Sequence, residues 1–486
     1  MSASEHAGFM SAIAANPADL TTRLIYADYL EETGEPQHTA RAEFIRAQIE
    51  SESLHANTTR RAELQKRASE LFARHWVDWW KPVCEAAGLP LPHVPGTRLR
   101  DRVARLFGSN EPPGSPYSKL HLRVVGPYTR IAPPFTPVEY VRGFPEWVRV
   151  GGDISVMGTR LDRWASVVPL VGLECDLLDH QSWEAIEGPH LESVRRLGLH
   201  HVQTSRYLGL HYVDNTFDFI SICRSSYFSQ IEEVGLNITG RPEGVRNLLT
   251  DFVASPLADH IRQLTVSVNT GQELDALAAG PGLGSLTDLH ISFRTGPPGY
   301  GQPLELVSPR GERVLLERHL FEQFVTGHPN LFMALAHSYF LSNVTGLSLT
   351  DTRFDTALDV LANSPMGRGL TRLAITGQVC NAQTIAVLAR PGAFPALVDL
   401  SLKDTDGDQP PWGVLASSRV IRRIRHLRVT LAKKVDYQIE REGFEKLLAA
   451  LDPERVETLR FGPPKAFPQA CVQRATQRFG ARVSFR

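Results

Sequence analysis

A short apolar pattern recurs along the chain from residue 170 to residue 461. It has the form Φ-x-x-Φ-x-Φ, where Φ is an apolar residue, and its alternating second half is typical of a strand that buries one face. The central positions of successive units are 24 to 37 residues apart, except for one step of 58 residues. The units span residues 170–175, 194–199, 231–236, 261–266, 286–291, 344–349, 370–375, 397–402, 424–429 and 456–461.

Helical patterns fill the intervals between these expected strands, as in FDTALDVLANSP and NAQTIAVLARPG. One strand-plus-helix unit cannot bury its own apolar face, but stacked neighbours form a continuous core. The repeat resembles the leucine-rich repeat, which has one strand in about 20–29 residues. This resemblance implies an α/β fold, a curved solenoid with parallel strands on its concave side and helices on its convex side. The asparagine ladder of that family is incomplete, since only Asn269 occupies the corresponding position.

The 58-residue step contains either an insertion or one eroded repeat. We place an insertion at about residues 293–340, because the first half of this segment is rich in Gly and Pro and predicts a loop or hairpin. In its second half, Leu315, Leu316 and Phe321 are expected to lie on one helix.

The first 87 residues have a helical pattern instead. Apolar residues at helical spacing predict three short helices over residues 4–55, separated by an Asn-Pro pair and by a glycine. A longer helix is expected over residues 58–87. It carries Trp76, Trp79 and Trp80, a cluster more typical of packing against a neighbouring element than of a recognition platform.

Part of this helical segment resembles a known family. The chain carries YADYLEE at residues 26–32, a Gly-Glu-Pro turn at residues 34–36 and RAEFIRAQ at residues 41–48. These motifs resemble those of the short repeat-companion domain at the N-terminus of many bacterial leucine-rich-repeat paralogues, although the insert QHTA lengthens the turn. The resemblance covers about a tenth of the chain. It implies association with repeats and no particular activity.

The patterns together predict three regions. A helical companion domain is expected at residues 1–56, and a helix followed by a proline-rich connection at residues 57–145. Residues 88–145 hold 11 of the 33 prolines, which is why irregular structure is expected there. The repeat solenoid is expected to occupy residues 146–486.

Composition narrows the class of protein. The chain has 486 residues, of which 42% are hydrophobic and 22% charged, as in ordinary globular proteins. Its formal net charge of −1 argues against a protein that binds polyanions over its whole surface. Five widely spaced cysteines form no C-x-x-C pair, and neither a signal peptide nor a membrane span is evident. A cytoplasmic location is therefore expected.

No motif of a known catalytic class stands out. A metal-dependent enzyme is one alternative, because a cluster of imidazoles and a carboxylate can bind zinc. Two of these histidines are adjacent, however, and adjacent residues of a strand point to opposite faces, which argues against convergence on one ion. The cluster of the His200 region comprises His200, His201, His211 and Asp214.

The N-terminal helices carry a second group of candidate ligands or catalytic acids, Asp28, Glu31, Glu32 and Glu43. Acidic and basic side chains at such spacings are more typical of surface ion pairs. We expect these carboxylates to pair with Arg23, Arg41 and Arg46. No enzymatic activity, bound metal or cofactor is therefore expected.

The residues between the apolar strand positions are expected to face the concave surface. That face is polar, of mixed sign and almost free of aromatic residues. Because solenoids commonly bind proteins along this surface, a protein partner is expected there, with a plain solvated face as the alternative. The candidate partner-binding residues are Arg196, His200, Glu233, Gln263, His290, Arg372, Asp399, Lys403, His426, Arg428 and Arg460.

One repeat near the C-terminus is strongly basic, with no acidic residue between positions 419 and 434. An acidic protein, or less favourably a nucleic acid, is the alternative partner at this repeat. Apolar residues interleave with the cations at strand spacing, so the segment also has the pattern of an ordinary repeat. The basic patch comprises Arg419, Arg422, Arg423, Arg425, Lys433 and Lys434. The sequence thus predicts a non-enzymatic protein-protein interaction scaffold.

Overall fold

The computed structural model divides into two compact units, Met1–Gly235 (unit 1) and Leu236–Arg486 (unit 2). The structure describes residues 3–54, 58–87, 135–150, 163–176, 188, 191–204, 206–208, 211–213, 216–240, 242–268, 271–293, 304–307, 313–316, 333, 336–352, 355–377, 382–404, 411–431, 441–462 and 466–485.

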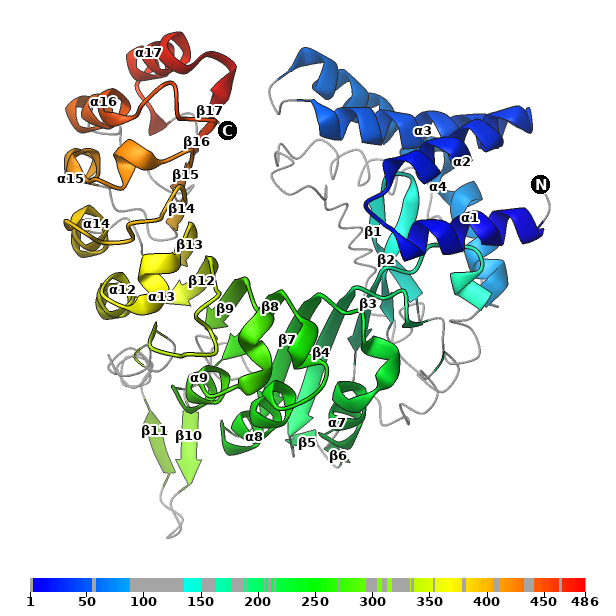
Figure 1. Ribbon diagram of the computed structural model, residues 1–486, viewed down its shortest axis with the longest axis horizontal. Coiled ribbons are helices and arrows are strands. Elements are labelled where there is room, and N and C mark those ends of the chain that lie inside the picture. The colour runs from blue at the N-terminus through cyan, green and yellow to red at the C-terminus, as the bar shows by residue number, and fades with distance from the viewer. Residues whose placement is uncertain are drawn as a thin grey trace. The chain divides into compact units, whose positions relative to one another are not determined.

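Unit 1 combines N-terminal helices with a largely parallel group of strands (Figure 1). β1 pairs antiparallel with β2, and β2–β3 and β3–β4 pair in parallel. β5 and β6 form a separate antiparallel hairpin. The helices are α1 (Ala3–Ala15), α2 (Leu20–Glu32), α3 (Pro36–Ser53), α4 (Thr59–Ala87) and α7 (Thr216–Arg224). The strands are β1 (Phe135–Val141), β2 (Phe144–Val150), β3 (Gly172–Asp176), β4 (Arg196–Thr204), β5 (Arg206–Leu208) and β6 (His211–Val213). β7 (Glu233–Gly240) contains the boundary between the units.

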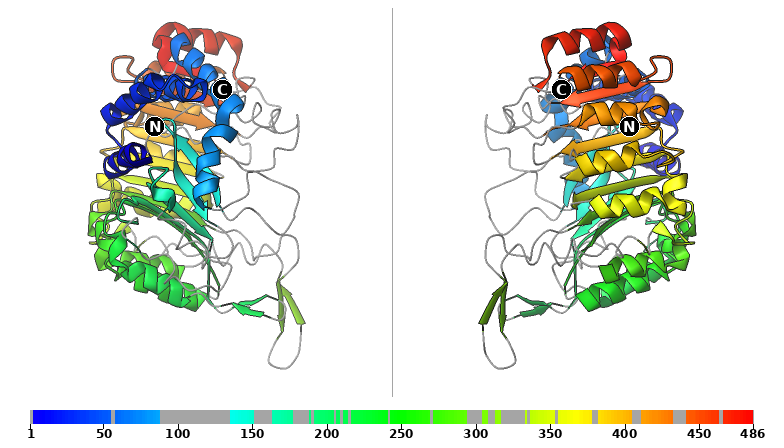
Figure 2. Two further views of the ribbon diagram at one scale, coloured as in Figure 1. Left: turned by 90° about the vertical axis from the view of Figure 1, so that its right-hand side faces the viewer. Right: turned by 90° about the vertical axis from the view of Figure 1, so that its left-hand side faces the viewer.

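Unit 2 alternates strands and helices. Apart from β10 and β11, its neighbouring strands pair in parallel, and its helices lie side by side along one side of these strands (Figures 1 and 2). The helices are α8 (Pro242–Val253), α9 (Gly271–Ala278), α12 (Asp355–Ala362), α13 (Pro365–Gly369), α14 (Ala382–Ala389), α15 (Trp412–Ser417), α16 (Arg441–Ala450) and α17 (Gln469–Phe479). The strands are β8 (Gln263–Val268), β9 (Asp288–Phe293), β10 (Leu304–Val307), β11 (Arg313–Leu316), β12 (Gly346–Thr352), β13 (Arg372–Gly377), β14 (Asp399–Asp404), β15 (His426–Thr430), β16 (Thr458–Gly462) and β17 (Val483–Phe485).

The apolar pattern of the sequence marks these strands correctly. Each unit of the pattern ends inside a strand, and its last two apolar residues face the core wherever their side chains are described, as Leu264 and Val266 do in β8. The first apolar residue of a unit, such as Ile261 or Ile424, is also buried. Equivalent positions lie in register, so that Leu373 of β13 pairs with its counterparts in β12 and β14. The prediction of an α/β fold with parallel strands is confirmed.

A second ladder of hydrogen bonds joins the backbone just before each strand begins. The carbonyl oxygen of Thr345 accepts bonds from the amides of Thr371 and Arg372, and that of Thr371 accepts bonds from Val398 and Asp399. The same pairing repeats at the next two strands. The backbone amides at the start of each strand thus find their hydrogen-bond acceptor in the preceding repeat. Each repeat is therefore stabilised by the one before it.

Buried serines follow the C-terminal ends of the unit 2 helices α8 and α12. The Ser255 hydroxyl donates to the carbonyl of Phe252, and the Ser364 hydroxyl donates to the carbonyl of Leu361 while accepting from the amide of Gly367. These serines satisfy backbone groups where the chain leaves one helix and enters the next short helical segment inside the apolar core.

The 58-residue step in the pattern is an insertion and not an eroded repeat. β12 pairs directly with β9, in register from Gly346 opposite Asp288 to Thr350 opposite Ser292. Within the described part of the step, β10 and β11 form an antiparallel hairpin of their own. The predicted helix is wrong at its start, because Leu315 and Leu316 belong to β11. Phe321 lies outside the described residues.

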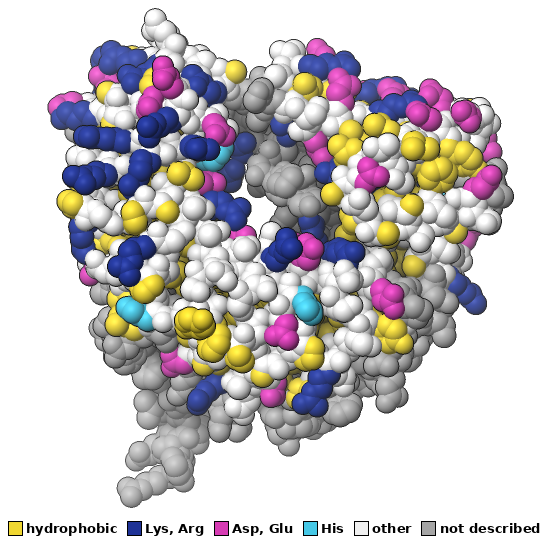
Figure 3. Space-filling view, in the orientation of Figure 1, with side chains coloured by type: hydrophobic (Ala, Val, Ile, Leu, Met, Phe, Trp, Pro, Cys, Tyr) yellow, Lys and Arg dark blue, Asp and Glu magenta, His cyan; other side chains and the backbone are white. Residues whose placement is uncertain are grey.

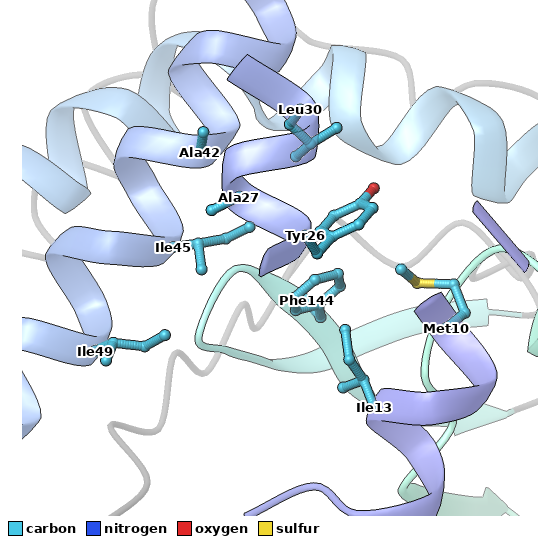
Figure 4. Close-up of a cluster of buried hydrophobic side chains, with 9 residues drawn as sticks. All are labelled: Met10, Ile13, Tyr26, Ala27, Leu30, Ala42, Ile45, Ile49 and Phe144. Atoms are coloured by element: carbon cyan, nitrogen blue, oxygen red, sulfur yellow. The ribbon is translucent and has the colours of Figure 1, made fainter. Parts of the chain in front are cut away.

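The predicted N-terminal helices are present as α1–α4, and Trp79 and Trp80 are buried as expected. The expectation of irregular structure up to residue 145 is wrong for residues 135–141, which form β1. The turn after β1 enters the core of the helices. Phe144 there is fully buried against Tyr26, in a cluster that also includes Met10 and Ile45 (Figure 4).

Polar contacts also hold this turn in place. Gly143 has φ +92° and donates its amide to Gln48 Oε1 at 2.5 Å. A Cβ on Gly143 would lie 2.1 Å from Cγ1 of Ile45, so only glycine fits. On one side of it, Arg142 donates to the Glu52 carboxylate at 2.8 Å.

A buried ion pair completes the contact between the helices and β2. Arg23 of α2 pairs with Glu146, and both side chains are buried. The guanidinium of Arg23 also donates to the carbonyl of Pro17 at 2.8 Å and lies 5.6 Å from the centre of the Phe144 ring. Burial raises the pKa of Glu146, although Arg23 acts in the opposite direction. Residues 1–54 are thus continuous with the sheet of unit 1.

Candidate functional site

The outward-facing side chains of the unit 2 strands form rows across the sheet, because equivalent residues lie in register. We call this side of β8, β9 and β12–β16 the strand face. Row 1 contains Gln263, Asp288, Gly346, Arg372, Asp399, His426 and Thr458. Row 2 contains Thr265, His290, Ser348, Ala374, Ser401, Arg428 and Arg460. Row 3 contains Ser267, Ser292, Thr350, Thr376, Lys403, Thr430 and Gly462.

Row 1 contains an ion pair that spans three strands. Arg372 of β13 donates to Asp288 Oδ1 of β9 at 2.6 Å, although β12 lies between these strands. The residue between them is Gly346, and a Cβ there would lie 2.1 Å from Asp288 Oδ1 and 3.2 Å from Arg372 Nη2. The missing side chain of Gly346 is therefore what lets the ion pair form.

Row 1 continues with Asp399 and His426, which are adjacent in register. Burial raises the pKa of Asp399, and the nearby basic side chains, His426 first among them, oppose this rise. His426 Nδ1 lies 2.9 Å from the Thr458 hydroxyl, and its Nε2 lies 3.4 Å from the Glu457 carboxylate. Acidic and basic groups thus alternate along this row.

Row 2 has a different character at its C-terminal end. Arg428 of β15 and Arg460 of β16 are directly opposite in register, and Arg428 is exposed. The preceding positions, Ala374 and Ser401, carry small side chains that leave the face open. Lys403 in row 3 is also exposed. The C-terminal half of the strand face therefore carries the exposed cations Arg428 and Lys403 and the half-buried Arg460 beside small side chains.

The other candidate partner-binding residues lie apart from this group. Gln263 and His290 belong to rows 1 and 2 near the first strands of unit 2. In unit 1, Arg196 and Glu233 form an ion pair at 3.1 Å between the β4 strand and the start of β7. His200 pairs in register with Asp176 of β3, and its side chain lies outside the described residues.

The predicted basic patch is divided by the structure. Arg419 and Arg422 are exposed in the turn before β15, whereas Arg423 donates to the carbonyl of Phe394 at 3.2 Å. Arg425 lies 3.7 Å from the Glu457 carboxylate. Figure 3 shows Lys and Arg side chains gathered over the C-terminal repeats. Lys433 and Lys434 lie outside the described residues.

Three of the four N-terminal carboxylates, Asp28, Glu31 and Glu43, form ion pairs, as the sequence predicted, but with partly different partners. Arg46 donates to Asp28 at 2.6 Å and to Glu31 at 2.7 Å. Glu43 instead pairs with Arg67 of α4 at 2.6 Å, and this bond lowers the pKa of Glu43. Arg23 pairs with Glu146 in place of these acids. In the described part of the chain, no group of three His, Cys, Asp or Glu residues is placed to hold a metal ion.

Sequence reasoning missed two residues of the strand face. Glu457 precedes β16 and contacts both Arg425 and His426, but it lies outside the strand pattern. Gly346 occupies a strand position where glycine is usually unfavourable, and this is a signal for close approach of another group. Glycine at an outward-facing strand position is therefore the feature that predicts such a bridge.

In the comparison with known proteins, no protein-family model matches the chain, and no curated protein matches it. Within the described ranges, none of the helices combines the length and the hydrophobicity that crossing a bilayer requires.

Proposed function

We propose that the chain is a non-enzymatic protein-protein interaction scaffold that acts in the cytoplasm without a metal or cofactor. In this proposal, residues 146–486 form a leucine-rich-repeat-like solenoid and residues 1–56 form its helical companion domain. The regular parallel pairing of strands in unit 2, with helices along one side only, supports the solenoid. The partner is a protein, and it binds on the strand face.

One observation carries the functional part of the proposal. The charged side chains of rows 1 and 2 lie in register on adjacent strands, and the strand backbone fixes their spacing at about 4.8 Å. A rigid platform of this kind positions charges before a partner arrives, so that little side-chain ordering is needed on binding. Acidic groups between the cations fit a folded protein surface better than a uniformly charged polyanion.

The end of the strand face that carries Arg428, Arg460 and Lys403 is positively charged. It therefore favours a partner with an acidic surface. Two arginines opposite each other on neighbouring strands suit carboxylates, which accept two parallel hydrogen bonds from a guanidinium. A nucleic acid is the rival ligand for the same cations. Such a ligand would show the steep salt dependence that comes with phosphate contacts.

Affinity capture from the native cell tests the proposal. The charge-reversal variant R428E/R460E should lose the captured partner, because both substitutions place like charges against its acidic surface. R368E/R455E carries the same change of charge on exposed residues away from the strand face and should retain the partner. Retention by both variants contradicts the proposal. A captured ligand that nuclease removes supports the nucleic-acid rival instead.

A further inference from the structure

The outer face of α2 is divided into an apolar half and an acidic half. Successive residues of a helix are about 100° apart, so the seven exposed residues of α2 fall within an arc of about 140°. Its buried side, which contains Tyr26, Ala27 and Leu30, occupies the opposite arc. In chain order, the exposed residues are Leu20, Thr21, Leu24 and Ile25, followed by Asp28, Glu31 and Glu32.

The apolar half is unusually exposed. Leu20, Leu24 and Ile25 are 37%, 36% and 52% exposed, and they are three of only six large hydrophobic residues exposed among the described ones. Figure 3 shows hydrophobic side chains gathered over the N-terminal helices. Scattered single residues of this kind need no explanation, but adjacent ones typically mark an interaction site.

The acidic half works against the stability of its own helix. Glu31 and Glu32 lie in the last turn of α2, where the helix dipole favours cations, and the last turn contains no basic residue. Only Arg46, from α3, offsets this charge by bonding to Asp28 and Glu31. An arrangement that is unfavourable for the isolated helix is better explained by a partner than by folding.

The charge of the whole N-terminal segment has the same sign. Residues 1–56 contain nine acidic and three basic residues. Two of those three, Arg23 and Arg41, are buried, so Arg46 supplies the segment's exposed basic side chain. A partner on this surface must therefore present both apolar and cationic groups.

We propose that the outer face of α2 binds a basic amphipathic helix of another protein, with apolar residues of that helix against Leu20, Leu24 and Ile25 and its Lys or Arg residues against Asp28, Glu31 and Glu32. Ridges of residues spaced by four, such as Leu20 and Leu24, are the usual contacts between two packed helices. This site is independent of the strand face, and its failure leaves the proposed function intact.

Fluorescence anisotropy of a labelled synthetic peptide on the full-length protein tests the site. The probe is an amphipathic Leu/Lys helix of about 18 residues, long enough for five turns. A scrambled peptide of the same composition is the reference. The intact probe should bind at least about tenfold more tightly than the scrambled one, and its affinity should fall as salt is added.

Two variants of α2 separate the apolar and acidic halves. L24S/I25S and E31Q/E32Q should each weaken binding of the probe about tenfold, and E31Q/E32Q should also flatten the salt dependence. V414S removes an exposed apolar residue of α15, and E442Q an exposed acid of α16; both should bind like the wild type. All of these side chains are exposed, and unchanged thermal melting of each variant confirms that it is folded.

Three results would overturn the inference. They are equal binding of the intact and scrambled probes, equal binding by wild type and the α2 variants, and self-association of the protein that L24S/I25S abolishes. The last result, read by sedimentation of the protein without probe, would identify a second copy of this chain as the occupant.

Discussion

Both units contain arginine–carboxylate pairs, but in different surroundings. In unit 1, the side chains of Arg23 and Glu146 are 0% and 6% exposed. In unit 2, the Arg372 side chain is 52% exposed and that of its partner Asp288 28% exposed. Breaking a buried pair leaves an uncompensated charge in the core, whereas an exposed pair contributes little to stability. Losing one member of the first pair should therefore destabilise the fold far more than losing one member of the second, which lies on the surface that we propose binds a partner.

The largest expected effect comes from breaking the buried pair. E146A leaves the Arg23 guanidinium buried without its carboxylate and should lower the free energy of unfolding by about 3–5 kcal/mol. D288A makes the matched change in the exposed pair and should lower it by less than about 1 kcal/mol. Chemical denaturation of both variants measures the difference. Similar losses for the two would show that burial does not distinguish these pairs.

The next effect concerns the turn that enters the N-terminal core. G143A should lower the free energy of unfolding by about 2–4 kcal/mol, because it combines a left-handed backbone with a clash against Ile45. Gly34 has a similar φ of +70° but open space around it. G34A should therefore lower the free energy of unfolding by only about 1–2 kcal/mol, the cost of the left-handed backbone alone. If the two variants lose equal stability, the contact with Ile45 is irrelevant.

A pH-dependent effect should arise from His6. Its Nε2 lies 3.2 Å from the carbonyl of Val167 and its Nδ1 3.0 Å from the Tyr26 hydroxyl, so the neutral ring donates to one and accepts from the other. Burial, with the charge of Arg41, lowers the pKa of His6 below its ordinary 6.5. The unfolded chain then binds more protons than the folded one below pH 6.5, and stability falls as pH drops.

H6N should remove this part of the pH dependence. The free energy of unfolding of the wild type, minus that of H6N, should decrease between pH 7 and pH 5 by at most about 1.4 kcal/mol per pH unit. The difference is measured by denaturation at several pH values. A difference that stays constant over this range would mean that His6 titrates alike in the folded and unfolded chains.

The smallest effect on stability is expected at Gly346. G346A places a methyl group where Arg372 reaches Asp288, and it should separate the pair while lowering the free energy of unfolding by less than about 1 kcal/mol. Partner capture should weaken all the same, because Arg372 loses its fixed position. S348A, at the next outward-facing position of β12, is the control for both measurements. A large loss of stability with unchanged capture would reverse the roles assigned to the two units.

The strands of the repeats could be predicted because the core positions of each strand follow a pattern within a few residues of sequence. Ile424, Leu427 and Val429 are such positions in and before β15. The contacts that define the two regions could not. Arg23 and Glu146 are more than a hundred residues apart, and nothing near Arg23 in sequence marks it as buried. The bridge over Gly346 depends on register across three strands. Local patterns predict elements, whereas the partners of charged side chains depend on how those elements pair.

Photo-crosslinking tests the central claim, that a protein binds the strand face of unit 2, most directly. A photoreactive residue at Ser401 lies in row 2 between Ala374 and Arg428, and one at Lys446 lies on the exposed side of α16. In native cells, Ser401 should form a protein adduct that resists nuclease and disappears in R428E/R460E, while Lys446 forms none. An adduct from Lys446 alone, or a Ser401 adduct that persists in R428E/R460E, would contradict the claim.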